Sequence, residues 1–242
     1  MSNRQDDILR ELNLYPLWKL RAASAPEQPS VAPVPAVGES MSSVAVEKSD
    51  PQSSAGLGWS ELKTMVRNCT ACKLRAGCTQ TVFGVGDEKA DWLFVGEGPG
   101  ADEDAQGEPF VGQAGQLLDN MLASIRLKRG VRVYIANIVK CHPPGNRVPE
   151  ATEIAQCLPY LAQQIKLIQP KLIVALGKTA ATSLLGRDTT LAALRGKPYE
   201  YKGIPLIITY HPAYLLRAPQ EKAKAWQDLC LAAGIMQGLT SV

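Results

Sequence analysis

The chain has 242 residues, of which 45% are hydrophobic, so it is long enough for one α/β domain with additional sequence. Its formal net charge of +3 is too small to identify a class of partner. No stretch approaches the roughly 18 apolar residues of a membrane span, and the charged start resembles no secretory signal. We therefore expect a cytoplasmic protein with no membrane partner, whose six cysteines are reduced.

Residues 1–57 are predicted to lie outside the folded domain. Residues 5–21 have an amphipathic helical pattern that Pro16 ends or kinks. Residues 22–57 are rich in Ala, Pro, Ser, Val and Gly, which is typical of a flexible linker. We therefore expect a disordered N-terminal arm, with an amphipathic segment at 1–21 and a linker at 22–57, followed by a folded domain at 58–242.

Apolar runs alternate with helical patterns in the folded domain. The predicted strands are 91–97, 131–138, 171–176 and 204–210. The predicted helices are 115–125, 149–168, 178–184 and 220–236. Nearly continuous apolar strands separated by helices indicate a parallel sheet that is covered on both faces. We therefore predict an α/β three-layer sandwich with a four-stranded parallel sheet flanked by helices.

Polar residues occur where three of the predicted strands end. The first strand ends at Glu97, the second carries Asn137 near its end, and the fourth is followed by His211. Ligands of open parallel sheets bind outside the carboxyl ends of the strands. We therefore expect these three side chains to meet in one active site.

Four of the six cysteines can share one metal centre. Cys69 and Cys72 form a C-x2-C pair, and 15 residues separate Cys141 from Cys157. Four thiolates suit either a four-iron cluster or a tetrahedral zinc ion, and the spacing does not separate the two. The alternatives are buried free thiols, or a competing ligand set that includes Cys78. Cys230, by itself on an amphipathic helix, is expected to be a free thiol.

Four segments resemble the motifs of family-4 uracil-DNA glycosylases. They are CTACKLRAGCTQTVFGVG (69–86), GEGPGADEDAQGEPFVGQAG (96–115), NIVKCHPPGNRVP (137–149) and HPAYLLR (211–217). Their order and spacing are those of the family, and the resemblance covers roughly residues 59–236. It implies an enzyme that hydrolyses the N-glycosidic bond of uracil in DNA and leaves an abasic site, the first step of base excision repair.

The resemblance also implies a cofactor and a set of site residues. The cofactor is a structural 4Fe-4S cluster held by Cys69, Cys72, Cys141 and Cys157, with zinc as the alternative. The substrate pocket is formed by Gly96, Glu97, Gly98, Phe110, Asn137 and His211. The catalytic candidates among these residues are Glu97, Asn137 and His211.

The chemistry of uracil removal fits these side chains. Phe110 offers a flat face on which an extruded base can stack. The Asn137 amide can accept from uracil N3–H and donate to O4, a pattern opposite to that of cytosine. His211 can donate to O2 as charge develops on the leaving base. Gly98 occupies a position where related glycosylases carry a water-activating Asp or Asn, so Glu97, Glu103 or no side chain takes that role here.

Further residues are candidates for contacts with DNA or with a partner protein. Leu215 or Leu216 resembles a wedge that fills the gap left by a flipped nucleotide, and Arg217 is expected at a phosphate. The alternative is a helix start that buries its leucines. Lys140 and Arg147 are either DNA-backbone contacts or solvated charges. Residues 11–15, within the segment 8–21, weakly resemble a peptide that binds the sliding clamp. The alternative interpretation of this segment is a frayed amphipathic tail.

Two other functional classes compete with the repair enzyme, which we expect to be a monomer. One is a non-catalytic nucleic-acid-binding module with an iron–sulfur cluster on the same scaffold. The other is an iron–sulfur electron carrier, although the sequence carries no flavin-docking or partner-docking signature. Some relatives of the family crosslink to DNA through a His in a basic insertion after the second motif. That insertion is absent from KCHPPGNRVP, which favours turnover over crosslinking.

Overall fold

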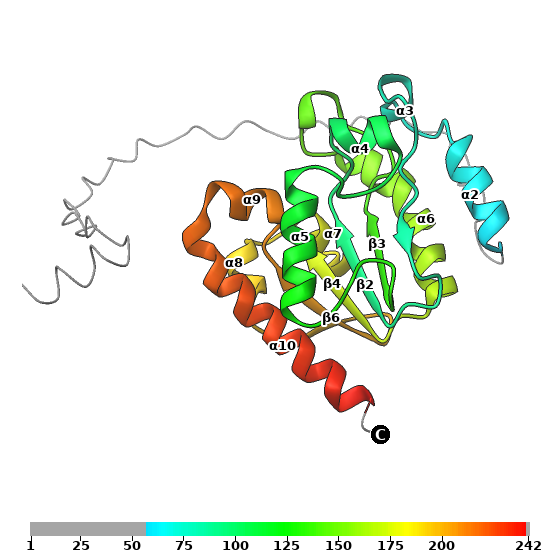
Figure 1. Ribbon diagram of the computed structural model, residues 1–242. Helices are drawn as coiled ribbons and strands as arrows, with labels where there is room; N and C mark the ends of the chain where they lie inside the picture. Colours follow the sequence, from blue (N-terminus) through cyan, green and yellow to red (C-terminus); the bar gives the residue numbers. More distant parts are fainter. Residues whose placement is uncertain (1–56, 241–242) are drawn as a thin grey trace, which may run out of the picture. The chain divides into compact units, whose positions relative to one another are not determined.

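The computed structural model describes residues 57–240, which belong to one compact unit (Figure 1). The amphipathic segment predicted at 1–21, the clamp-binding peptide within it and the linker up to residue 56 lie outside the described residues. Among the residues that are described, no helix is long and apolar enough to cross a membrane.

A six-stranded mixed sheet forms the centre of the domain, with the strand order β1-β3-β2-β4-β6-β5. The four predicted strands are its inner members and run parallel: β2 (Trp92–Gly96), β3 (Val133–Asn137), β4 (Leu172–Leu176) and β6 (Ile204–Thr209). The α/β prediction is therefore confirmed. The prediction of a purely four-stranded parallel sheet is wrong, because two antiparallel edge strands, β1 (Val85–Gly86) and β5 (Tyr199–Tyr201), complete the sheet.

The two edge strands are short and lack an apolar pattern, which explains why the sequence did not reveal them. Gly86 in β1 has a φ of 136°, and a β-carbon there would collide with the backbone of Val133. β5 is joined to β6 by Lys202 and Gly203, whose φ angles are 50° and 84°. Positive φ at both central residues is typical of a two-residue type I′ hairpin turn. Only Gly203 of this pair is a residue that favours such a turn, so the local signal for the hairpin was weak.

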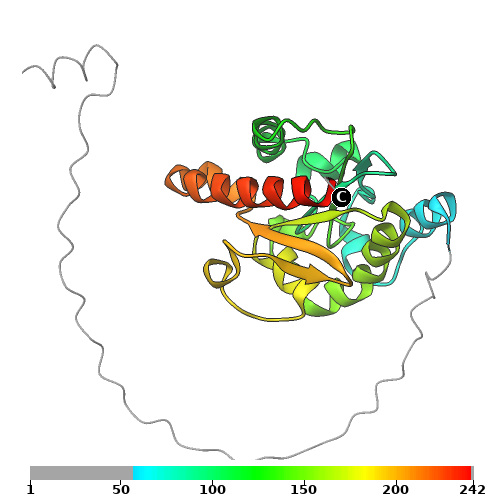
Figure 2. The ribbon, with the colours of Figure 1, turned by 90° about the horizontal axis from the view of Figure 1, so that it is seen from below.

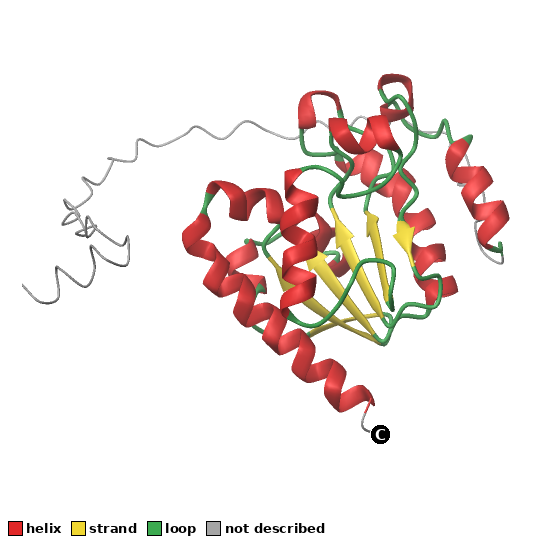
Figure 3. Ribbon diagram, in the orientation of Figure 1, coloured by secondary structure: helices red, strands yellow, loops and turns green. Residues whose placement is uncertain are grey.

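Helices cover both faces of the sheet and complete the three layers (Figures 2 and 3). One face is covered by α5 (Gln113–Ser124), α9 (Pro212–Arg217) and α10 (Lys222–Thr240). The other is covered by α6 (Ala151–Ile168) and α7 (Lys178–Leu185). Smaller elements are α2 (Trp59–Arg67), α3 (Leu74–Gly77), α4 (Ala101–Gln106), α8 (Leu191–Leu194) and the 3-10 turns η1 (Pro144–Asn146) and η2 (Pro219–Glu221).

The continuous apolar strands supply both cores at once, because successive side chains of a strand point to opposite faces. In β2, Leu93 and Val95 pack with α6 and α7, whereas Trp92 and Phe94 pack with α5 and α10. All four are buried. Burying a side chain of this size contributes about 1.5–3 kcal/mol, so the two cores hold the strand ends in fixed positions.

The strand register aligns the carboxyl ends of the parallel strands. Gly96 pairs with Asn137 across β2 and β3, and Leu176 pairs with Thr209 across β4 and β6. The chain segments that follow these strands therefore begin at one edge of the sheet. Glu97 and His211 lie in those segments, as the sequence predicted.

Candidate active site

One open pocket lies at the carboxyl edge of the parallel strands. Residues that follow β2, β3, β4 and β6 line it, together with the 143–149 loop and the start of α9. The pocket brings together most of the predicted site residues: Glu97, Gly98, Phe110, Asn137, His211 and Arg217. The sequence therefore identified side chains that converge in space from four separate segments.

Gly96 lies behind the pocket and allows two of these side chains to approach each other. A β-carbon at position 96 would lie 2.6 Å from Cζ of Phe110 and would collide with Oδ1 of Asn137. Asn137 is 2% exposed, and its Oδ1 is buried without a hydrogen-bond donor. A buried acceptor without a donor is costly unless a ligand supplies one. The amide is thus arranged to receive a polar ligand.

Phe110 is held in an unusual backbone conformation at the pocket wall. Its φ of 57° lies in the left-handed region, which non-glycine residues rarely adopt. Arg129 stabilises this conformation by donating to the carbonyls of Pro109 and Phe110 at 2.9 and 2.8 Å. The Phe110 ring stacks beside the His211 ring, with 5.4 Å between centroids. Arg129 was not predictable as a site residue, because it lies 19 residues from Phe110 and belongs to no motif.

Glu103 uses both carboxylate oxygens to hold the backbone of the first motif. One oxygen accepts from the amides of Val111 and Gly112, at 2.9 and 3.2 Å, and the other accepts from Gly100 at 3.0 Å. Three backbone amides thus fix the turn that carries Phe110. Glu97 has a different environment, because its carboxylate accepts one hydrogen bond, from the hydroxyl of Thr179 in α7.

His211 is the N-cap of α9, and its protonation state follows from its surroundings. Burial lowers the pKa of His211 to about 4, and the positive charge of Arg217 contributes to the shift. The Ala213 backbone amide donates to Nδ1 at 3.2 Å. The imidazole is therefore neutral at neutral pH, and its single proton is on Nε2.

The two leucines of α9 have different environments. Leu215 is 1% exposed and packs in the core beneath α5 and α10, whereas Leu216 is 41% exposed. A wedge must reach DNA from the surface, so Leu215 is not available for that role in this conformation. The alternative reading of the motif, a helix start that buries a leucine, applies to Leu215.

Four cysteines converge around one apolar cavity beside the pocket: Cys69, Cys72, Cys141 and Cys157. Cys141 and Cys157 are buried, and burial raises the pKa of the Cys157 thiol to about 11. Without a cation these thiols are neutral, and binding a metal would deprotonate them. Cys78 does not line the cavity; its Sγ accepts from Arg75 at 3.7 Å.

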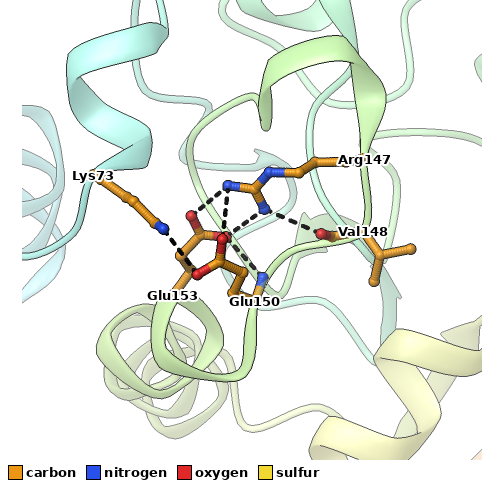
Figure 4. A network of polar contacts seen from close by, with 5 residues as sticks. All are labelled: Lys73, Arg147, Val148, Glu150 and Glu153. Atoms are coloured by element: carbon orange, nitrogen blue, oxygen red, sulfur yellow. Dashed lines mark hydrogen bonds and ion pairs between the residues drawn. The ribbon is translucent and has the colours of Figure 1, made fainter.

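The two basic residues of the second motif both bond to partners within the protein. Lys140 is 2% exposed, so it is neither a DNA-backbone contact nor a solvated charge. Burial lowers its pKa to about 8, against an opposing effect of Cys157. Arg147 makes two hydrogen bonds to the carboxylate of Glu153, at 2.6 and 2.8 Å (Figure 4). Both residues therefore stabilise the loops around the pocket.

Comparison with known proteins agrees with this arrangement. The model of the uracil DNA glycosylase superfamily matches residues 83–230. The type-4 uracil-DNA glycosylase of Archaeoglobus fulgidus is 47% identical over 171 residues, which is 67% of this chain and 85% of that protein. The chain belongs to the type-4 uracil-DNA glycosylases. The type-4 enzymes of Pyrobaculum aerophilum and Thermotoga maritima are 41% and 46% identical, over 72% and 63% of this chain and 92% and 80% of their own lengths.

In this type-4 uracil-DNA glycosylase, a chain of charges connects the first cysteine pair to the pocket loop. Lys73, next to Cys72, forms an ion pair with Glu150 at 3.0 Å. Glu150 lies 3.7 Å from Arg147, whose main partner is the fully buried Glu153 (Figure 4). Glu153 is the buried member of this doubly hydrogen-bonded pair, whereas the Arg147 side chain is 35% exposed, so Glu153 is the carboxylate on which the network depends most.

Replacing Glu153 with glutamine is expected to lower the free energy of unfolding by about 1–2 kcal/mol at pH 7. Arg147 lowers the pKa of Glu153 below its ordinary value. The stabilisation that ionised Glu153 contributes is therefore complete above the ordinary carboxyl pKa. It is lost as the pH falls through the lowered pKa of Glu153. Urea unfolding at several pH values should show that the difference in free energy of unfolding between the variant and the wild type becomes smaller in acid.

The Glu150→Gln variant is the matched control. Its ion pair with Lys73 joins two side chains that are 47% and 66% exposed, so the loss at pH 7 should stay below about 0.5 kcal/mol. An equal loss in the two variants, or a Glu153→Gln defect that does not change with pH, contradicts this assignment.

Proposed function

We propose that this chain hydrolyses the N-glycosidic bond of uracil in DNA and leaves an abasic site. The observation that carries the proposal is the buried, donor-free Oδ1 of Asn137 beside the ring of Phe110, in a pocket at the strand ends. Relatives that share 41–47% identity are named type-4 uracil-DNA glycosylases. A uracil base supplies both the flat face and the N3–H donor that this pair lacks.

The base is read by shape and by hydrogen bonds. Phe110 stacks on the extruded pyrimidine, and the missing side chain of Gly96 leaves room for the Phe110 ring and the Asn137 amide that bind the base. Asn137 accepts from N3–H and donates to O4, so cytosine presents a mismatched pattern. Because Asn137 is buried, a mismatch leaves polar groups unpaired, which is costly.

His211 stabilises the leaving base. The bond from Ala213 to Nδ1 leaves the proton on Nε2, where it donates to O2 as negative charge develops on uracil. A neutral imidazole needs no counter-charge in the site. Its protonation state also does not change around neutral pH. The environment of His211 is thus suited to electrostatic stabilisation of the departing anion.

The pH dependence of uracil excision tests this role. Since burial lowers the pKa of His211 to about 4, the imidazole stays neutral as the pH falls from about 8 to about 5. Single-turnover rates should therefore show no step from His211 in this range, and a step only near the lowered pKa, where protonation of Nδ1 replaces the bond from Ala213. In the His211→Asn variant the rate should fall at neutral pH and that acidic step should vanish. A His211-dependent step near pH 6.5 would contradict the assignment.

Glu97 is the stronger candidate for positioning water at the sugar. Its carboxylate accepts one hydrogen bond from the hydroxyl of Thr179 and retains further acceptor capacity in the pocket. Glu103 is occupied by three backbone amides and instead maintains the turn that presents Phe110. The catalytic set is therefore Glu97, Asn137 and His211.

Leu216 and Arg217 contact the DNA around the flipped nucleotide. Both follow the pocket wall on α9, and Leu216 is one of the exposed large apolar side chains of the described chain. An exposed leucine can fill the space that the extruded base leaves in the duplex. Arg217 lines the pocket mouth and can pair with a phosphate.

Cys69, Cys72, Cys141 and Cys157 are proposed to hold a 4Fe-4S cluster. Four thiolates around one zinc ion would lie about 3.8 Å apart, from Zn–S bonds of about 2.3 Å. The four cysteines line one shared cavity, and four thiolates suit either a zinc ion or a four-iron cluster. The resemblance to the family favours the cluster. When bound, the cluster serves as a structural crosslink between three chain segments.

An oligonucleotide assay separates the enzyme from the non-catalytic binding module. Purified protein is incubated with DNA that carries one uracil, and abasic sites are revealed by alkaline cleavage. We expect strand breaks at uracil and none at cytosine. Binding without abasic product over a range of salt concentrations would favour the binding module. Single-stranded and duplex substrates, and hypoxanthine in place of uracil, define the substrate range.

A further inference from the structure

Lys140 is unusual among the charged residues of this domain. Among the described residues it is the only lysine or arginine that is buried, and none of their ion pairs involves it. A buried cation without a carboxylate partner is costly and is retained where it has a specific task. Its contacts point to two neighbours: the Asn137 backbone and the cysteine cavity.

On the pocket side, Lys140 fixes the end of β3. Its Nζ donates to the backbone carbonyl of Asn137 at 2.9 Å and to Oε1 of Gln164 at 2.6 Å. Gln164 in α6 is fully buried and donates in turn to the carbonyl of Phe83 at 2.9 Å. The backbone that carries the Asn137 amide is therefore tied to α6 through one ammonium group.

On the cysteine side, Lys140 is part of the cavity wall. The residue lines the same cavity as the four cysteines, and its backbone amide donates to Sγ of Cys157 at 3.2 Å. Four thiolates would bring negative charge into a buried region, where a nearby positive charge is worth more than in water. Hydrogen bonds to ligand sulfurs also influence the properties of a cluster.

We propose that Lys140 is a positioning residue that couples the thiolate cluster to the Asn137 side chain. This inference rests on the proposed function. The ammonium compensates the charge of the cysteine thiolates and, through its bond to the Asn137 carbonyl, holds the amide in register with the base. Occupation of the cysteine site and accuracy of base recognition are thereby linked through one side chain.

The test compares iron-loaded wild type with Lys140→Met, which has a similar length but neither charge nor donor. Iron release to a chelator is followed by the absorbance near about 400 nm, and uracil excision by single-turnover kinetics. We expect about tenfold faster iron release and about tenfold slower excision. Lys166→Met, an exposed position on α6, is the matched control and should behave as wild type.

A second variant separates the two contributions and does not depend on how Lys140→Met folds. Lys140→Gln keeps an N–H donor and removes the charge. Its excision rate should therefore lie closer to the wild-type rate than its rate of iron release does. Wild-type rates of both iron release and excision in either variant would overturn the proposal. A variant that only melts at lower temperature, with both rates unchanged, would overturn it as well.

Failure of the proposed function has a different signature. If the wild type does not excise uracil, the function is wrong, while iron release still reports on the cluster side of Lys140. The pocket side is then measured by binding DNA that carries 2′-fluoro-deoxyuridine, which resists cleavage, against the same DNA with cytosine. An unchanged preference between the two DNAs in Lys140→Met, which lacks the donor to the Asn137 carbonyl, would overturn the coupling.

Discussion

Replacing Asn137 with aspartate is expected to slow uracil excision by about 1,000-fold and to bring the rates for uracil and cytosine closer together. The Asn137 side chain is buried, so its pattern of donor and acceptor is not rescued by water. An ionised aspartate has no donor for O4 and repels it. A protonated aspartate can donate to N3 of cytosine and accept from its amino group, so discrimination is lost.

The measurement is single-turnover excision from matched oligonucleotides with uracil or cytosine at one position. Asn146→Asp is the control, because Asn146 lines the mouth of the same pocket and its Oδ1 is bonded to His142 at 2.8 Å. It places the same charge near the pocket without altering the buried amide. Unchanged discrimination in Asn137→Asp, or an equal loss in both variants, would remove Asn137 from the recognition of the base.

Replacing Cys141 with serine is expected to abolish iron binding and to lower the melting temperature by more than about 10 °C. Cys141 is buried at the cavity that Cys69, Cys72 and Cys157 also line. A cluster crosslinks the segment before α3, the loop after β3 and α6, so its loss releases three parts of the chain at once. Excision should fall as well, since the loop after β3 continues from Asn137.

Iron content, the absorbance near about 400 nm and thermal melting measure this effect. Cys230→Ser is the control: Cys230 is exposed on α10, and its replacement should leave all three quantities unchanged. Cys78→Ser tests the competing ligand set and should also retain iron. Full iron content in Cys141→Ser, or loss of iron in Cys78→Ser, would contradict the proposed ligands.

The central fold was predictable because its signals are local. The four parallel strands are continuous apolar runs, and both of their faces are covered, so the pattern does not depend on which helix covers which face. The predicted helices lie within a few residues of α5, α6, α7 and α10. The edge strands were missed because two or three residues are too few to show an alternation of apolar and polar side chains.

Side-chain partners distant in the sequence were not predictable. Lys140 bonds to Gln164, and no local pattern distinguishes this lysine from an exposed charge. The same holds for Arg129, which bonds to the carbonyl of Phe110 from a different segment. Such contacts depend on how α6 and the loop after α5 dock, which is decided by packing.

The sequence by itself determined three features: the order along the chain of the apolar runs that form the parallel strands, the polar residues at the ends of these strands, and the spacing of the cysteines. These features follow from local composition, and parallel pairing then brings the strand ends to one edge. The tertiary structure alone decided which leucine of α9 is buried, that Glu103 is saturated by amides and that Lys140 lies inside. Burial is a property of the packed layers, and a residue's own neighbours in the chain do not set it.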